Sequence, residues 1–119
     1  ILKMNDLKRL SARFYRSDNE KEPVRGWRLG LDAADRTSFG EDIRTAEFGW
    51  PIGMPICRAI SGRRGIWEIR SSLAQGRIAR VLFCVRGDSM ILLHGFIKKS
   101  QKTPDRELDV AVRRMRGLK

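Results

Sequence analysis

The sequence contains no long hydrophobic segment. Its longest uninterrupted apolar run, residues 81–85, is far shorter than the roughly 20 residues of a membrane-spanning helix. The first residues also lack the basic, apolar and small-residue regions of a secretory signal peptide. We therefore expect a cytoplasmic protein that does not associate with a membrane.

Cysteine and histidine are also scarce. The two cysteines, Cys57 and Cys84, form no CxxC pair and have no histidine at the spacing of a metal site. In a reducing compartment such cysteines are typically small apolar residues. The sequence thus predicts no disulfide, no metal and no cofactor.

Basic residues, in contrast, are abundant. The 119 residues include 25 Lys and Arg but only 14 Asp and Glu, which leaves a formal net charge of +11. The excess is uneven, because residues 1–57 carry a net charge of +1 and residues 58–119 carry +10. A polyanion such as nucleic acid is the expected partner, and its binding surface is expected in the C-terminal half.

The apolar pattern predicts one α+β domain with the element order βααββββα. A short strand at residues 12–16 precedes two helices between Pro23 and Trp50, where apolar residues recur at helical spacing. Residues 12–119 are expected to form the domain, and residues 1–11 a leader or an added extension. The spacing alternates after Pro55, which predicts four strands near residues 56–60, 66–71, 77–86 and 89–98.

The last predicted helix begins after the final strand. Thr103 suits the N-cap and Pro104 the first helical position. Leu108, Val112 and Met115 then recur at helical spacing, so this stripe is expected to pack on the sheet. The expected architecture is a small antiparallel or mixed sheet with an N-terminal helical hairpin and this C-terminal helix packed on it.

Charged side chains interrupt the predicted strands. Alternation places Glu68 and Arg70 on one face, opposite to Trp67 and Ile69, and we expect the charged pair to face outward. Arg80 lies in an otherwise apolar strand, which is costly unless the arginine meets a partner or a polyanion. Glu68, Arg70 and Arg80 are therefore candidates for a functional site.

Further candidates lie in one loop and around the end of the last strand. His94 lies within that strand, and the basic residues after it come just before a helix N-terminus, where phosphate binds favourably. The other basic candidates lie in a loop bounded by glycines and could contact a nucleic-acid backbone. These basic residues are Arg63, Arg64, Lys98, Lys99 and Lys102.

Three segments, in this order, resemble a known family. They are Gly-Ile-Trp-Glu-Ile-Arg at residues 65–70, Gly-Arg-Ile-Ala-Arg-Val-Leu-Phe at 76–83, and Leu-Leu-His-Gly-Phe-Ile-Lys-Lys-Ser-Gln-Lys-Thr-Pro at 92–104. From about Phe14 onward the chain resembles the phage-derived HigB-like branch of the RelE/HigB toxins. The resemblance implies a RelE-like microbial RNase fold, a helix-turn-helix antitoxin similar to HigA as partner, and cleavage of mRNA on the translating ribosome.

The resemblance also implies roles for individual residues. Arg70 and Arg80 match basic positions on two successive strands and would bind the scissile phosphate and its transition state. Lys98 and Lys99 match basic residues after the last strand, one of which would protonate the leaving 5′-oxygen. Glu68 is the nearest candidate base for attack by the ribose 2′-OH.

Several assignments stay open at this point. Some relatives have a tyrosine or additional histidines near the active centre, whereas this chain has one tyrosine, Tyr15, and one histidine, His94. His94 is either a structural strand residue or an acid–base group, and Glu68 is either ion-paired or catalytic.

Two other functions compete with mRNA cleavage. A ParE-like gyrase inhibitor would share the fold but would not need a converging set of arginine, lysine and acid. A non-catalytic RNA-binding module would stack bases on exposed aromatic residues. Trp67, Phe83 and Phe96 lie in apolar strands, and we expect them in the core.

Overall fold

The computed structural model describes residues 8–98 and 102–118, except for the side chain of Lys98. The described elements are β1 (Ser11–Phe14), α1 (Pro23–Leu29), α2 (Ala33–Gly49), β2 (Cys57–Ala59), β3 (Trp67–Ser72), a 3₁₀ turn η2 (Ala74–Gly76), β4 (Ile78–Arg86), β5 (Ser89–Lys98) and α3 (Asp105–Arg116). The predicted order of helices and strands is confirmed. No helix in these parts of the chain is long and apolar enough to span a membrane.

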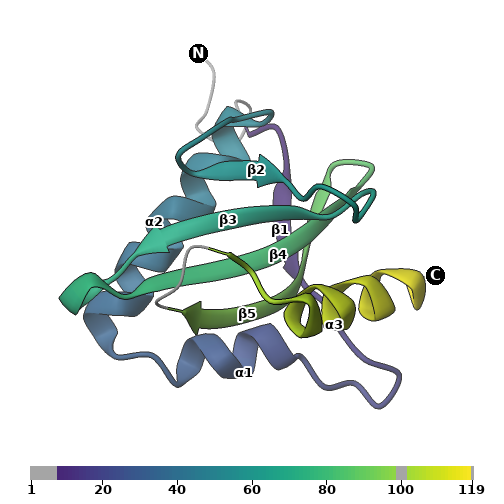
Figure 1. Ribbon diagram of the computed structural model, residues 1–119, viewed down its shortest axis with the longest axis horizontal. Coiled ribbons are helices and arrows are strands. Elements are labelled where there is room, and N and C mark those ends of the chain that lie inside the picture. Colours follow the sequence, from purple (N-terminus) through teal and green to yellow (C-terminus); the bar gives the residue numbers. More distant parts are fainter. Residues whose placement is uncertain (1–7, 99–101, 119) are drawn as a thin grey trace.

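The strands form one mixed sheet in the order β1-β5-β4-β3-β2 (Figure 1). β1 runs parallel to β5, and all other neighbours are antiparallel. Gly87, with a φ of 60°, supplies the left-handed conformation in the tight turn between β4 and β5. In Figure 1, α3 lies in front of the sheet and α2 lies behind it. The sheet is therefore the middle layer of the α+β domain.

One apolar cluster fills the space between the sheet and the N-terminal helices. Phe39 and Ile43 of α2 and Val24 of α1 pack against Ile69 and Phe83 of the central strands. α2 begins immediately after Asp32, whose carboxylate accepts a hydrogen bond from the Asp35 backbone N–H at 2.9 Å. This cap marks the start of the second of the two helices predicted between Pro23 and Trp50.

A second cluster lies between the sheet and α3. Leu108 is buried there, and Val112 and Met115 pack on the same cluster, which confirms the predicted stripe. Leu82 and Cys84 of β4 supply part of the opposing surface. Because both faces are covered, alternation along a strand here separates two cores and not a core from solvent.

The start of α3 differs from the prediction. The helix begins at Asp105, and its N-cap is Pro104, which makes no side-chain capping hydrogen bond. Thr103 is therefore not the cap. Its hydroxyl donates instead to Oε2 of Glu68 at 2.5 Å, which ties the segment before α3 to the middle of the sheet.

A β-bulge in β5 decides which residues face α3. Leu82 pairs with His94, but the next residue of β4, Phe83, pairs with Leu92, so Leu93 is an extra residue in β5. A one-residue shift in register moves every following side chain to the other face. The bulge therefore turns His94 toward α3.

Gly95, next to the bulge, is required by close packing. A Cβ atom at this position would lie 2.7 Å from Cε3 of the Trp27 indole in α1. Trp27 is itself packed edge-on against Phe39, with ring centroids 5.6 Å apart. The missing side chain thus lets α1 approach β5 directly.

The folded region begins earlier than the predicted boundary at residue 12. Leu10 is 4% exposed and belongs to the core, and Ser11 is the first residue of β1. Glu47 of α2 holds this segment, because its carbonyl accepts the N–H of Leu10 and its carboxylate accepts the N–H of Ala12 at 2.7 Å. Two residues assigned to a leader therefore belong to the domain.

We expect Gly95→Ala to destabilise the protein by about 1–3 kcal/mol, because the added methyl must displace the Trp27 ring. Urea denaturation would measure the change in the free energy of unfolding. Gly26→Ala is the matched control, since a Cβ there meets no atom within 4 Å and alanine favours a helix interior. Equal stability of the two variants would contradict the packing argument.

Candidate functional site

The register of the central strands gathers four of the predicted residues on the α3 face. Arg70 of β3 is directly opposite Arg80 of β4, and Glu68 is opposite Leu82, whose other partner is His94. Side chains on directly opposed residues share a face. The sequence therefore predicted correctly that Glu68 and Arg70 lie on the face opposite to Trp67 and Ile69.

Glu68 does not face outward as expected, and Arg80 meets its partner in Glu68. Their side chains are 0% and 1% exposed, and Arg80 Nη1 lies 2.8 Å from Glu68 Oε1. Arg58 of β2 places its Nε 3.3 Å from the same oxygen, and Thr103 donates to the other oxygen. The burial arises because α3 and the segment before it cover this face of the sheet.

This environment limits what Glu68 and Arg80 can do chemically. A buried carboxylate that accepts hydrogen bonds on both oxygens has little capacity left to remove a proton from a substrate. A buried pair is also costly to disrupt, since removing one partner leaves an uncompensated charge. Glu68 and Arg80 therefore form a framework that holds the neighbouring groups.

Arg70 differs from Arg80 in its surroundings. Its side chain is partly exposed, and within residues 8–98 and 102–118 it forms no ion pair with a carboxylate. Its Nε is buried and has no hydrogen-bond partner among these residues. Like charges directly opposite each other on a sheet are unfavourable, so the place of Arg70 beside Arg80 favours binding of an anion.

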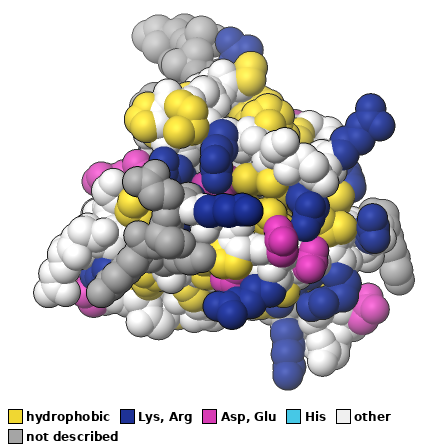
Figure 2. All heavy atoms as spheres, viewed as in Figure 1, with side chains coloured by type: hydrophobic (Ala, Val, Ile, Leu, Met, Phe, Trp, Pro, Cys, Tyr) yellow, Lys and Arg dark blue, Asp and Glu magenta, His cyan; other side chains and the backbone are white. Residues whose placement is uncertain are grey.

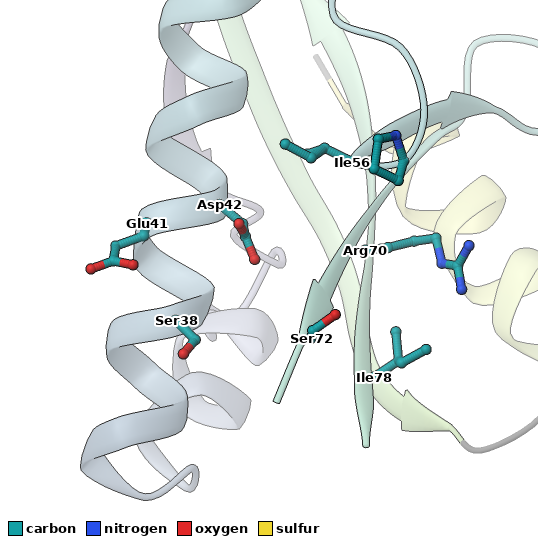
Figure 3. Close-up of a pocket in the computed structure, with 8 residues that line it drawn as sticks. Ser38, Glu41, Asp42, Ile56, Arg70, Ser72 and Ile78 are labelled. Carbon is teal, nitrogen blue, oxygen red and sulfur yellow. The ribbon is translucent and has the colours of Figure 1, made fainter. Parts of the chain in front are cut away.

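Arg70 lies at the side of a cleft of about 400 Å³ between β3 and α2. Glu41 and Asp42 of α2 line the opposite side, and Asp42 accepts a hydrogen bond from the Ser71 hydroxyl at 2.5 Å. Figure 3 shows that the Arg70 guanidinium extends from β3 away from both carboxylates. An anion would therefore reach Arg70 from the α3 side, away from the acidic wall.

His94 belongs to a cluster between β5 and α3. Its Nε2 lies 3.3 Å from Glu107 Oε1, an electrostatic contact without hydrogen-bond geometry, and its Nδ1 lies 3.5 Å from Nη1 of Arg114. Arg114 also donates to the Leu93 carbonyl at 2.7 Å. Burial lowers the pKa of His94, although Glu107 opposes the shift. The ring thus anchors α3 on the sheet.

A basic cleft beside the Glu68–Arg80 pair includes a residue that sequence reasoning missed. Arg58, with its side chain 40% exposed, lines a cleft of about 230 Å³ together with Lys102, which is exposed, and Thr103. Arg58 lies directly opposite Glu68 in the sheet. The sequence offered one signal for Arg58: it lies in the predicted strand that precedes the strand of Glu68.

The remaining candidates are spread around this face. Arg63 places its Nη2 3.4 Å from Asp109 and 3.6 Å from Asp105, so it is tied to the start of α3, whereas Arg64 is exposed. Lys98 is the last residue of β5. Its side chain and the whole of Lys99 lie outside the described residues, so their predicted roles stay predictions.

The face as a whole is basic but uneven. Figure 2, which views the α3 side, shows Lys and Arg side chains from the β2 end of the molecule across its centre to α3, with acidic side chains among them.

Among the described residues, no three His, Cys, Asp or Glu side chains are grouped so that they could hold a metal ion. The two cysteines are buried free thiols, and burial raises the pKa of Cys57 to about 11.

The fold and this face define a small α+β protein with a basic surface on a mixed sheet. Residues 27–116 match the family described as phage derived protein Gp49-like (DUF891), and the chain belongs to this family. The family is toxin-like and associated with toxin–antitoxin systems. A search of curated proteins found no significant match.

We expect Arg80→Met to lower the free energy of unfolding by about 3–5 kcal/mol, because it leaves Glu68 buried without its closest cation. The double variant Glu68→Leu with Arg80→Met should lose less, since it removes both buried charges. Urea denaturation of both variants, with the exposed Arg86→Met as control, measures this coupling. A double variant less stable than Arg80→Met would contradict it.

The lowered pKa of His94 predicts a pH-dependent stability. Protonation is easier in the unfolded chain, where the pKa is near 6.5, so the histidine's contribution is present above that pH and is lost as the pH falls through the lower folded value. We expect the free energy of unfolding to fall more between about pH 7.5 and pH 5.5 in the wild type than in His94→Gln. Identical pH profiles would show that His94 does not titrate in this way.

Proposed function

We propose that this protein is the toxin of a type II toxin–antitoxin system and that it cleaves mRNA on the ribosome without a metal. Its membership of a toxin-like family supports the first part, and the resemblance to RelE/HigB toxins in three strand and loop segments supports the second. The proposal includes a cytoplasmic location and a HigA-like helix-turn-helix antitoxin as partner.

The observation that carries the proposal is the environment of Arg70. It is a cation opposite a second cation, with a buried Nε that lacks an acceptor among the described residues. A guanidinium forms paired hydrogen bonds with phosphate oxygens. Arg70 would therefore bind the scissile phosphate. The buried Arg80 and Glu68 would act as positioning residues for Arg70.

In the proposed reaction the ribose 2′-oxygen attacks phosphorus while its proton passes to solvent water, and the bond from phosphorus to the 5′-oxygen breaks. The products are a 2′,3′-cyclic phosphate and a 5′-hydroxyl. Arg70 would stabilise the negative charge of the transition state, and Lys98 or Lys99 would protonate the leaving oxygen. Because Glu68 is ion-paired and buried, we do not assign it the role of base. We assign His94, in contact with Glu107 and Arg114, an anchoring role.

Arg58, Lys102 and Arg64 would extend this surface along the RNA backbone. The competing RNA-binding module finds little support, because Phe83 and Phe96 are 0% and 8% exposed and unavailable for stacking on bases. Trp67 packs edge-on against Trp50, with ring centroids 4.8 Å apart.

We expect Arg70→Ala to reduce mRNA cleavage by about a hundredfold or more, because an electrostatic contact to the transition state is lost. The purified protein would be added to a translation reaction programmed with one defined mRNA, and primer extension would map the cut ends. Thermal unfolding should change little, since Arg70 forms no ion pair among the described residues. Arg86→Ala, at an exposed arginine in the β4–β5 hairpin, is the matched control.

The outcomes separate the competing functions. Intact mRNA together with gyrase-linked DNA damage in expressing cells would overturn the proposal in favour of a ParE-like toxin. RNA binding without new mRNA ends would indicate a non-catalytic RNA-binding module. Tolerance of the expressed protein in the absence of a partner gene would argue against a toxin of either kind.

A further inference from the structure

Gly40 lies in the middle of α2 without a packing reason. A Cβ there would meet no atom within 4 Å, whereas a Cβ at Gly95 would collide with Trp27. Glycine weakens a helix interior relative to alanine. The space above Gly40 is open, as it is above Gly26, but only Gly40 lies where hollows meet.

Three hollows meet at Gly40. The first, of about 150 Å³, lies between β1 and α2. The second, of about 420 Å³, lies between the C-terminal end of α1 and the first part of α2. The third, of about 240 Å³, lies near the C-terminal part of α2. The first two share Arg28 and Gly40, and the last two share Gly40 and Arg44. We call the three hollows around Gly40 together the α2 groove.

The α2 groove is predominantly basic. Of its two carboxylates, Glu47 is already engaged by Lys8 at 2.9 Å and by the backbone of β1, and only Glu41 is exposed. The Arg44 guanidinium lies over the Phe48 ring, 5.5 Å from its centroid. The basic side chains that line the groove are those of Lys8, Arg28, Arg36 and Arg44.

The hollow next to β1 is apolar at its base. Phe14, Phe39, Ile43 and Leu92 line it, and Arg28 supplies its charged side chain. Arg13 also borders the hollow, but its side chain lies on the opposite face of β1, where its Nε donates to the Ser89 hydroxyl. Its volume suits one aliphatic side chain. A nucleobase would need polar partners for its edges, which the apolar residues at its base do not offer.

We propose that the α2 groove binds an acidic segment of a partner protein, which inserts one aliphatic side chain between β1 and α2 and places carboxylates against Arg28, Arg36 and Arg44. α2 lies on the side of the sheet away from α3 (Figure 1). Glu41 lines both this groove and the cleft beside Arg70, but the Arg70 guanidinium extends away from Glu41 (Figure 3). This interaction does not depend on RNA cleavage.

Fluorescence anisotropy with the full chain tests the proposal. The probe is a short labelled peptide with one leucine among aspartates and glutamates, and the comparison peptide carries serine in place of leucine. We expect the leucine peptide to bind about tenfold more tightly, because one aliphatic side chain is buried. Gly40→Met, which fills the groove, and Arg44→Glu should each weaken binding by about tenfold or more.

Gly26→Met is the matched control, because Gly26 is a helical glycine with equally open space and lines none of the three hollows. It should leave peptide affinity unchanged. Circular dichroism would verify that all variants are folded. Gly40→Met should also retain mRNA cleavage, so loss of cleavage and loss of peptide binding test different proposals.

Three results would overturn the inference. Equal affinity for the leucine and serine peptides would show only general attraction of acidic chains to a basic protein. Loss of binding to a single-stranded RNA probe in Gly40→Met would make the groove an RNA surface. A wild-type dimer in size-exclusion chromatography that Gly40→Met converts to a monomer would make the occupant a second copy.

Discussion

Removing a carboxylate or a guanidinium from water costs several kcal/mol, and the cost is offset only when opposite charges meet with good geometry and satisfied hydrogen bonds. Glu68 and Arg80 meet this condition at the centre of the sheet, 2.8 Å apart and almost completely covered. Thr103 links the carboxylate to the segment before α3, and Arg58 links it to β2. The edge strand, the central strands and the last helix are thus organised around one buried charge.

This arrangement explains why two arginines in directly opposed positions have different roles. Arg80 is neutralised by its ion pair with Glu68, whereas Arg70 forms no ion pair with a carboxylate among the described residues. The acids nearest to Arg70 in the cleft belong to α2 and lie on the other side of β3 (Figure 3). The Glu68–Arg80 pair is fixed, and Arg70 beside it is less compensated. Such a cation is held in place for a ligand, because it needs no reorganisation when the ligand binds.

The sequence predicts this fold as far as short-range periodicity reaches. The element order, the inward positions of Trp67 and Ile69 and the stripe on α3 follow from spacing along one segment. Periodicity assigns Glu68 to a face but cannot tell what covers that face, so its burial was missed. The role of Thr103 was wrong for a related reason, because its partner is 35 residues away.

The bulge in β5 could not be predicted from local periodicity either. It turns His94 toward α3. The next residue, Gly95, lies against Trp27, a contact between distant parts of the chain. Strict alternation after Leu92 would have placed His94 on the opposite face. The orientation of the only histidine in the sequence thus depends on one extra residue in β5, which the apolar pattern does not reveal.

Net charge counted along the sequence also hides how charge is distributed in space. Residues 1–57 are nearly neutral, yet the α2 groove in this half is lined mainly by cations. Many of the acids of this half are used internally: Asp32 caps α2, Asp35 pairs with Arg77 at 2.6 Å, and Glu47 holds β1. Carboxylates that satisfy backbone groups leave arginines on the surface without matching charge. A half that is neutral by count can therefore still present a surface for an acidic partner.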